Sequence, residues 1–387
     1  MEEWKEYKLG DILNFRRGHD LPHSKMKDGN IPVAGSNGII GYHNEATPVS
    51  PCITIGRSGN VGTPYIYKQC WAHNTVLYID DFKQNDPLYL YYLLKSLPLS
   101  SFGGGSAVPT LNRNHIHPLI IKHTPNINTQ RQIASILKSL DDKIEVNRRI
   151  NDNLEQQAQA LFKSWFVDFE PFRDQPFVES ELGMIPEGWR VGSFLDNIYV
   201  MPGGTPSTNV DEYWKDGTIP FFSPKDVNGV YCFETEKNIT ELGLNNCSSR
   251  LYPKDTLFIT ARGTVGKIAL AGVPMAMNQS NYALAAKEGV GKFYLYLLTQ
   301  TLVSTLLKKA NGAVFSAITT KDFNEPNLIP ANNVMDSFEV IVKPIFDKIF
   351  QTSEESRRLA QLRDSLLPRL MSGELKVDEI KGIDYGY

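Results

Sequence analysis

The sequence has few of the features that mark a membrane or secreted protein. Its four cysteines are Cys52, Cys70, Cys232 and Cys247. They are too scattered for a zinc knuckle or a disulfide framework, which suits a reducing compartment. No apolar run approaches the roughly 20 residues that span a bilayer, and residues 1–5 (MEEWK) lack the apolar stretch of a signal peptide. We therefore expect a cytoplasmic protein without a membrane segment.

The sequence also lacks the basic excess that is usual in proteins that coat DNA. It contains 40 Lys and Arg against 43 Asp and Glu, for a formal net charge of -3 among 387 residues. Residues 1–130 hold 12 basic against 10 acidic residues and all seven histidines, whereas residues 174–332 hold 13 against 16. Any DNA binding must therefore come from local loops or from positive charge on partner subunits.

Signatures of catalysis are missing as well. Residues 263–267 (GTVGK) are too short for a P-loop and continue with Ile268. Neither the Gly-rich loop nor the Asn/Asp-Pro-Pro-aromatic stretch of a DNA methyltransferase occurs. The pairs His19/His23 and His115/His117 lack a supporting set of carboxylate or cysteine ligands. We expect no catalytic site, cofactor or metal; a nuclease built from scattered acidic residues is a minor alternative.

An internal duplication organises what is present. Four segments return in the same order 186–205 residues later, which is the period of duplicated domains and is too long for a solenoid. The pairs are 9–12 with 195–198, 28–32 with 216–220, 57–62 with 262–266, and 89–94 with 294–298. The third and fourth pairs each differ in length by one residue. We predict an α+β fold with a pseudo-two-fold internal repeat.

The predicted boundaries follow from this repeat. Short β-rich runs separated by Gly, Pro and Asn favour two globular domains of mixed α/β structure. Heptad-spaced apolar residues favour a long helix after each of them. The expected parts are 1–127 and 171–332 (globular domains), 128–170 and 333–375 (long helices), and 376–387 (a tail).

The two helices share an apolar seam with a shift of 205 residues. The seam residues of the first helix are Leu137, Leu140, Ile144, Asn147, Asn151, Leu154 and Leu161. Those of the second are Ile345, Ile349, Thr352, Ser356, Leu359, Leu366 and Leu370. Polar seam positions fall near the middle of each helix, where an antiparallel pair would bring them together. We predict an antiparallel coiled coil between the globular domains; two helices packed separately on their own domains are the alternative.

Candidate nucleic-acid contacts lie in Gly-containing loops and their neighbours. Arg suits guanine, Asn and Gln suit adenine, and glycines allow close backbone approach. In the first domain the candidates are Arg57, Ser58, Asn60, His73, Asn74 and Arg113. In the second they are Arg262, Thr264, Lys267, Asn278, Gln279 and Lys321. A structural arginine or a turn cap is an equally open interpretation for most of them. Arg16 and Arg17 are interpreted as solvated surface.

Several stretches resemble a known family. Residues 161–171 (LFKSWFVDFEP) followed by 183–189 (GMIPEGW) resemble the junction between halves in the specificity subunits of Type I restriction-modification enzymes. Residues 366–375 (LLPRLMSGEL) and 130–141 (QRQIASILKSLD) resemble the end and the start of the family's conserved helices. The resemblance covers essentially the whole chain, although an acidic second domain is unusual in a DNA reader.

The resemblance implies a function. In that family each globular part is a target recognition domain that reads one half of a split, asymmetric site in double-stranded DNA. The helix pair sets the spacer between the halves, and two methyltransferase subunits dock on it. Restriction (motor-nuclease) subunits join the complex, which methylates adenine or cleaves. The alternatives are a protein-binding adapter with a coiled-coil spacer, and a specificity subunit of a different restriction type.

Overall fold

The computed structural model describes residues 4–103, 110–309 and 317–380 of the chain. These residues form two compact units, which are described separately below. Unit 1 comprises Met1–Ile144 with Arg358–Tyr387, and unit 2 comprises Glu145–Arg357. Among the described residues, no helix combines the length and the apolar character needed to cross a bilayer.

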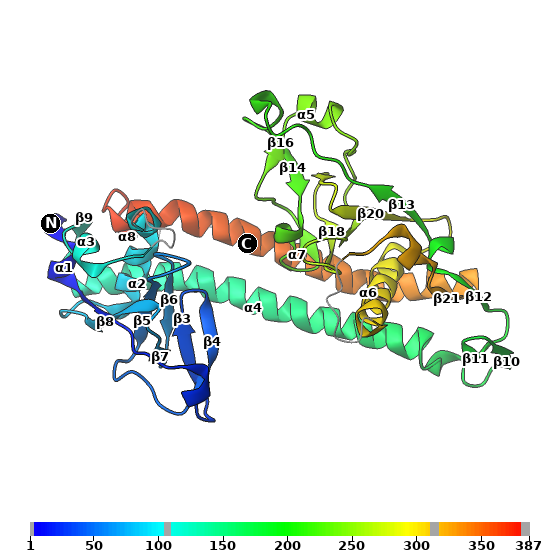
Figure 1. The fold of residues 1–387 in the computed structure, drawn as a ribbon, viewed down its shortest axis with the longest axis horizontal. Coiled ribbons are helices and arrows are strands. Elements are labelled where there is room, and N and C mark those ends of the chain that lie inside the picture. The colour runs from blue at the N-terminus through cyan, green and yellow to red at the C-terminus, as the bar shows by residue number, and fades with distance from the viewer. Residues whose placement is uncertain (1–3, 104–109, 310–316, 381–387) are drawn as a thin grey trace. The chain divides into compact units, whose positions relative to one another are not determined.

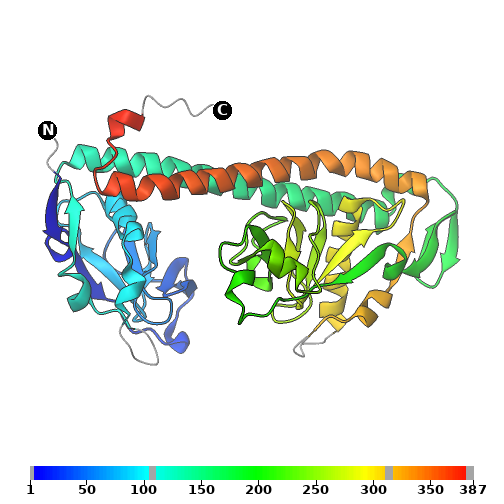
Figure 2. The same cartoon turned by 90° about the horizontal axis from the view of Figure 1, so that it is seen from above.

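Two helices of 40 residues contribute to both units, α4 (Ile127–Phe166) and α7 (Asn332–Met371). Each has an amphipathic pattern, because its apolar residues recur every three or four positions and gather on one face. In each unit α7 lies beside α4 (Figure 1; Figure 2).

Unit 1 contains three small sheets. β1 (Lys5–Lys8) pairs with β9 (Ile120–His123). A four-stranded sheet has the order β2 (Asn14–Arg17), β8 (Val76–Asp81), β5 (Cys52–Gly56), β6 (Pro64–Tyr67). A three-stranded sheet has the order β4 (Gly38–His43), β3 (Ile31–Gly35), β7 (Trp71–Ala72). The short helices are α1 (Leu9–Ile12), α2 (Pro87–Ser96), α3 (Arg113–Ile116) and α8 (Val377–Ile380), with 3-10 turns at His23–Lys25 and Leu99–Phe102.

Unit 2 repeats this arrangement. β12 (Arg190–Ser193) pairs with β21 (Pro326–Ile329). The large sheet has the order β13 (Ile198–Pro202), β20 (Asn281–Ala286), β17 (Leu257–Thr260), β18 (Ile268–Ala271), β15 (Tyr231–Cys232). The small sheet has the order β16 (Asn238–Ile239), β14 (Ile219–Phe222), β19 (Ala276–Met277). Strand for strand the orders match those of unit 1, with β15 as an addition, so the predicted duplication is confirmed.

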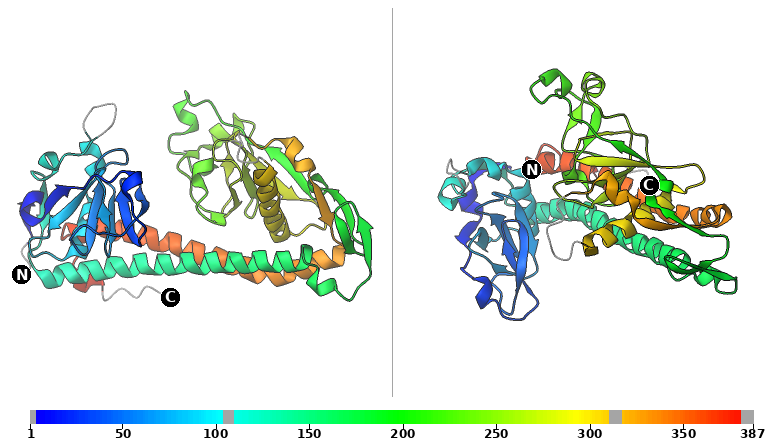
Figure 3. Two further views of the ribbon diagram at one scale, coloured as in Figure 1. Left: turned by 60° about the horizontal axis from the view of Figure 1, so that its bottom comes forward. Right: turned by 45° about the vertical axis from the view of Figure 1, so that its right-hand side comes forward.

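A hairpin, two helices and several 3-10 turns complete unit 2, and the helix after β20 takes the place that α2 holds after β8 in unit 1. The hairpin of β10 (Phe177–Ser180) and β11 (Gly183–Pro186) follows α4. Helix α6 (Lys292–Lys309) packs against β18 and β20 (Figure 3). The remaining elements are α5 (Glu241–Asn245) and 3-10 turns at Glu170–Phe172, Phe194–Asp196, Asp211–Tyr213, Pro224–Asp226 and Thr320–Asn324.

The core of unit 1 joins α2, the four-stranded sheet and both long helices. Leu137 and Leu140 of α4 lie in one buried cluster with Leu366 and Leu370 of α7. At the edge of this seam the Asp141 carboxylate accepts hydrogen bonds from the Tyr92 hydroxyl at 2.8 Å and from Arg363 Nη1 at 2.6 Å. The seam in unit 1 therefore ends in a polar cluster.

The core of unit 2 is rich in aromatic rings. Phe162 and Phe166 near the end of α4 pack around Phe338 near the start of α7, with ring centroids 6.2 and 4.9 Å away. Among the other predicted seam residues in this unit, Ile349 is buried, while Leu154, Leu161 and Ile345 are partly buried against the same cluster. In unit 1, Leu359 is buried and Ile144 partly buried.

The polar middle of the seam lies in unit 2. Asn147 Nδ2 donates to Glu355 Oε2 at 2.8 Å, and Asn151 Nδ2 donates to Ser353 Oγ at 2.9 Å. The Thr352 hydroxyl donates to Asn151 Oδ1. We expected Ser356 also to pair across the seam with the polar residues of α4. This was wrong, because its hydroxyl donates to the Thr352 carbonyl of its own helix at 2.9 Å. A serine in mid-helix commonly satisfies itself in this way.

The direction of the helix pair follows from these contacts. In unit 1 the first half of α4 packs on the last half of α7. In unit 2 the last half of α4 packs on the first half of α7. The helices are therefore antiparallel in each unit. The predicted α+β class with two mixed domains and an antiparallel helix pair is confirmed.

Candidate nucleic-acid interface

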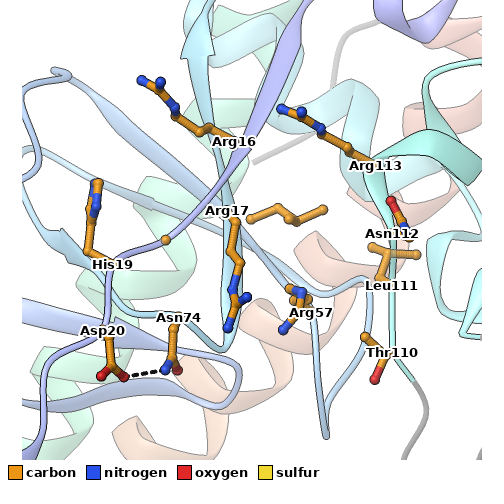
Figure 4. A pocket seen from close by; sticks show the side chains of 12 residues that line it. Arg16, Arg17, His19, Asp20, Arg57, Asn74, Thr110, Leu111, Asn112 and Arg113 are labelled. Carbon is orange, nitrogen blue, oxygen red and sulfur yellow. Dashed lines mark hydrogen bonds between the residues drawn. The ribbon is translucent and has the colours of Figure 1, made fainter.

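A cavity of about 750 Å³ opens in unit 1 where β2 and β5 end and β8 begins (Figure 4). We call it the first cavity. Its lining residues are Arg16, Arg17, Gly18, His19, Asp20, Arg57, Asn74, Leu77, Thr110, Leu111, Asn112 and Arg113. Leu77 and Leu111 are buried and give it an apolar base. Four arginines around one opening make it a site for an anionic or electron-rich ligand.

Strand register places two of these arginines on either side of β8. Arg17, the last residue of β2, pairs with Leu77, and Gly56, the residue before Arg57, pairs with Val76. The Arg57 backbone N–H donates to the Thr75 carbonyl at 2.8 Å. The pKa of Arg57 is lowered, first by partial burial and then by the neighbouring charge of Arg17. The Arg57 guanidinium nevertheless stays cationic at neutral pH, because arginine does not lose its proton in proteins.

The other two arginines are held at the margin. Arg113 Nη1 donates to the Phe15 carbonyl at 3.1 Å, which fixes its side chain across β2. Arg16 lies 3.9 Å from the Asp80 carboxylate and is well exposed. Both remain available to a negatively charged ligand, because neither is enclosed by the fold.

The two amide side chains that line the first cavity, Asn74 and Asn112, each make a hydrogen bond within the protein. Asn74 Nδ2 donates to Asp20 Oδ1 at 2.5 Å (Figure 4). Asn112 caps α3 by accepting from the Asn114 N–H at 3.0 Å. Each amide therefore has a structural partner in the free protein.

Three predicted residues of the first domain lie outside the cavity lining. Ser58 bridges Thr110 through its backbone. Asn60 Oδ1 accepts a hydrogen bond from the Thr63 hydroxyl at 3.0 Å within the same loop. His73 Nδ1 lies 3.1 Å from the Thr75 hydroxyl, and burial lowers the pKa of its ring. The cavity thus unites Arg57, Asn74 and Arg113 but not these three.

Unit 2 has a cavity of about 550 Å³ beside its own Gly-containing loop, which we call the second cavity. It is lined by the predicted residues Arg262, Thr264, Asn278 and Gln279, together with Thr205, Thr208, Trp214, Phe221, Ser223, Pro224, Lys225, Glu236, Lys237, Gly263 and Ser280. Lys267 and Lys321 are exposed and do not line it.

Polar contacts fix much of the second cavity. Gln279 Oε1 accepts from the Thr205 hydroxyl. Asn278 Oδ1 accepts from the Ser280 N–H at 2.9 Å and from Asn281 Nδ2 at 2.7 Å. The cation of Lys225 lies 3.2 Å from Glu236. Its lining thus mixes hydroxyls, amides and both charges, whereas arginines dominate the first cavity.

Backbone hydrogen bonds correct the alignment of the two Gly-containing loops. Gly62 N–H donates to the Gly56 carbonyl, and Gly266 N–H donates to the Thr260 carbonyl, each at 2.8 Å. The loops are therefore equal in length, and the predicted difference of one residue was wrong. Gly59 and Gly263 occupy the same left-handed position, with φ of 85° and 80°.

This register separates arginines that the sequence had paired. Arg262 corresponds to Ser58, since Ser58 bridges Thr110 and Arg262 bridges Ala317, and Arg57 corresponds to Ala261. Likewise Leu111 N–H donates to the Arg57 carbonyl and Ile318 N–H to the Ala261 carbonyl, so Arg113 corresponds to Thr320 and not to Lys321. The sequence pairing matched Arg57 with Arg262 because the residues are identical. The backbone hydrogen bonds show instead which loop positions are equivalent.

The sequence analysis interpreted Arg16 and Arg17 as solvated surface; both are indeed exposed, but they also line the first cavity, which it did not predict. A usable signal was present, because Gly18 follows them directly. A Cβ at Gly18 would lie 2.0 Å from the His73 carbonyl oxygen, and a Cβ at Gly203 would lie 2.0 Å from the Asn278 carbonyl oxygen. A glycine that is required at the same place in both repeats marks where β2 and β13 leave the sheet beside the cavity.

The described residues contain no group of three or more His, Cys, Asp or Glu side chains arranged to hold a metal ion.

Comparison with known proteins identifies the family. The model of the Type I restriction modification DNA specificity domain matches residues 1–156 and 186–330. The chain is 31% identical to the Type I restriction enzyme MjaIX specificity subunit of Methanocaldococcus jannaschii, over 76% of this chain and 70% of that one. It is 26% identical to the HindI specificity subunit of Haemophilus influenzae, over 97% and 100% of the two chains.

A solved structure agrees at the level of fold. The crystal structure of a Type I restriction-modification S subunit from M. genitalium superimposes with a TM-score of 0.57 at 16% identity, covering 95% of this chain and 96% of that one. With the repeated specificity domain and a relative above 30% identity, the chain belongs to the specificity subunits of Type I restriction-modification systems.

Proposed function

We propose that this subunit recognises an asymmetric, bipartite site in double-stranded DNA, with one half contacted at each cavity. The observation that carries the proposal is that each copy of a repeated fold bears a cavity beside its Gly-containing loop, and the two cavities are lined by different side chains. Equal folds predict equal modes of approach to DNA, and unequal linings predict unequal half-sites.

The chemistry of both cavities favours nucleic acid. Arginine donates to guanine and to phosphate, and amide side chains pair with adenine. Contacts to base edges carry sequence information, whereas contacts to phosphates position the protein. The predicted residues Arg57, Asn74, Arg113, Arg262, Thr264, Asn278 and Gln279 are proposed as the contacts within the cavities. Ser58, Asn60, His73, Lys267 and Lys321 are proposed as contacts from the surface next to the cavities, where Ser58 and His73 are partly buried and the other three are exposed.

The long helices suit a structural role in a larger complex. We assign residues 1–127 and 171–332 to target recognition and residues 128–170 and 333–375 to the helix pair that sets the spacer. Two methyltransferase subunits would dock on the helix pair, and restriction subunits would join the same complex. The subunit itself would be non-catalytic and would direct adenine methylation or cleavage by its partners.

Mapping methylated adenines in cells that carry this subunit and its methyltransferase partners tests the proposal. We expect one asymmetric, two-part motif with a fixed spacer. The Arg262→Ala variant should relax one part of the motif and leave the other part and the spacer unchanged. A symmetric or continuous motif, or methylation that does not depend on this subunit, would contradict the proposal.

Inserting seven residues into each long helix tests the role of the helix pair. One heptad adds about 10 Å of helix, so the preferred spacer should lengthen or binding should be lost. Replacing one heptad by another of equal length is the matched control. An unchanged spacer in the insertion variant would show that the helices do not set it.

A further inference from the structure

We infer that the first cavity reads a G·C base pair, with Arg17 and Arg57 donating to guanine and Asp20 accepting from the cytosine amino group. This inference rests on the proposed function and specifies the class of half-site that unit 1 recognises. It also assigns a specificity role to Arg17 and Asp20, which lie outside the contacts proposed above.

Arg17 and Arg57 are placed so that both can reach one ligand in the first cavity. Arg17 and Gly56 are registered to Leu77 and Val76, which are adjacent residues of β8. The two side chains therefore leave the sheet from strands on either side of β8 and line one cavity. In Figure 4 the guanidinium ends of Arg17 and Arg57 point into the same space. Guanine presents two adjacent acceptors, O6 and N7, which match the paired donors of a guanidinium.

The surroundings of the pair favour a base edge over a phosphate. Leu77 and Leu111 close the base of the cavity with apolar surface. Such a surface suits the face or edge of a heteroaromatic ring, while phosphate is better bound by exposed cations and backbone N–H groups. Arg16 and Arg113 lie at the margin of the cavity and suit the flanking phosphates.

Asp20 supplies a hydrogen-bond acceptor, which arginine side chains lack. A carboxylate repels phosphate, so an acidic group in an arginine-lined DNA cavity is unfavourable unless it serves a base. Cytosine offers an N4 amino donor in the major groove, and carboxylates accept from it. The hydrogen bond from Asn74 Nδ2 orients the Asp20 carboxylate at 2.5 Å and leaves it further lone pairs.

Adenine is disfavoured in the same cavity. Reading adenine takes a free amide that both donates and accepts. The bond to Asp20 takes one N–H of Asn74, and the Asn112 carbonyl caps α3, so both amides are held in orientations that these partners fix. Asn74 is thus left to support Asp20 in this cavity. Arginine has no acceptor for the adenine amino group. The second cavity differs, because one arginine, Arg262, shares it with Gln279 and several hydroxyls.

Selection from a random duplex library tests the inference. The full chain with its methyltransferase subunits is used to enrich sequences, and the wild type is compared with Arg17→Ala, Arg57→Ala, Arg57→Lys and Asp20→Asn. Arg262→Ala in the second cavity is the matched control. Thermal melting of each variant checks that its fold is retained, which is expected because Arg17 and Asp20 are exposed.

We expect the wild type to enrich G·C in one half-site. Arg57→Ala should lose roughly 10- to 100-fold of the preference for that pair, the range of one good bidentate contact to O6 and N7. Arg17→Ala removes a further single donor and should lose less. Arg57→Lys should not restore the preference, since lysine keeps the charge but not the paired donors. Asp20→Asn should weaken discrimination at the same base pair, and Arg262→Ala should change only the other half-site.

Two results would overturn the inference while leaving the proposed function intact. One is a bipartite motif whose G·C content is unchanged by the Arg17 and Arg57 variants. The other is full rescue by Arg57→Lys together with a shallower salt dependence in Arg57→Ala, which is the behaviour of a phosphate contact. Absence of any enriched bipartite sequence with the wild type would instead refute the proposed function, and the inference with it.

Discussion

The polar cluster at the edge of the unit 1 seam should be replaceable by the apolar cluster that unit 2 carries at the same place. With a shift of 205 residues, Tyr92, Asp141 and Arg363 correspond to Leu297, Phe346 and Ala158. The three unit 2 residues are buried in its core. We therefore predict that Arg363→Ala destabilises unit 1, and that adding Asp141→Phe and Tyr92→Leu restores its stability.

The magnitude follows from the contacts. The side chains of Arg363 and Asp141 are 18% and 26% exposed, so solvent screens their 2.6 Å contact incompletely. Removing Arg363 takes away its hydrogen bond to Asp141 and a contact with the exposed Asp364 carboxylate, which contributes little. The Asp141 carboxylate keeps Tyr92 at 2.8 Å and Lys95 at 3.7 Å. Loss of a hydrogen bond to a charged group costs about 2 kcal/mol. Replacing a buried ion pair by apolar residues that fit is often neutral, so the triple variant should come within about 1 kcal/mol of wild type.

The assay is urea unfolding combined with hydrogen exchange of peptides from α2 and from residues 358–371, because the two units need not unfold together. Lys343→Ala is the matched control: it removes an ion pair with Asp347 on α7 whose partners are 56% and 48% exposed. That pair should contribute at most about 0.5 kcal/mol.

Acid adds an independent check. Hydrogen bonds from Arg363 and Tyr92 lower the pKa of Asp141 below its ordinary 3.8, despite partial burial that opposes them. A lowered pKa stabilises the fold above the unfolded pKa, and this stabilisation is lost as pH falls through the folded pKa. The triple variant should lack this acid-sensitive part. If Arg363→Ala costs no more than Lys343→Ala, or if the triple variant is as unstable as the single one, the reasoning is wrong.

Three further predictions follow from the structure. Gly203→Ala should destabilise unit 2 by about 1–3 kcal/mol, because its Cβ would lie 2.0 Å from a carbonyl oxygen. Gly229→Ala, with open space around the added Cβ, should not destabilise it, and equal melting temperatures of the two variants would contradict this. Burial lowers the pKa of His123 to about 4, so as pH falls the unfolded state binds a proton before the folded state does. Unit 1 should therefore lose up to about 3 kcal/mol of its free energy of unfolding between pH 7 and pH 4. The slope of that free energy against pH should flatten in His123→Phe, and an unchanged slope would show that this histidine is not the cause. Cysteines at 137 and 366 should cross-link and cysteines at 137 and 342 should not; the reverse would contradict an antiparallel pair.

The pattern of the sequence was sufficient for the class of fold and the helix pair. Heptad spacing depends only on which residues are apolar, and it was repeated with a constant shift of 205 residues. The duplication was readable for the same reason, since several short segments kept their order. Even the polar middle of the seam, at Asn151 and Thr352, could be placed, because an antiparallel pair brings helix centres together.

The cavities were only partly readable. Arg57 and Arg113 were identified by residue type, and so were Arg262 and Gln279. The contribution of Arg17 was missed, because a charged residue at a strand end is usually solvated, and only the register of β2 with β8 brings it beside Arg57. Hydrogen bonds between β-strands that are distant in sequence set this register, and no local pattern reports them.

The sequence by itself thus determined two mixed domains joined by long antiparallel helices, since periodicity and duplication are properties of the chain alone. Only the tertiary structure decided which side chains share a cavity and which loop positions correspond. In the repeat, Arg262 takes the place of Ser58 and not of Arg57. The physical reason is that backbone hydrogen bonds within each domain define which positions of the two domains correspond. The side chains at corresponding positions are free to differ.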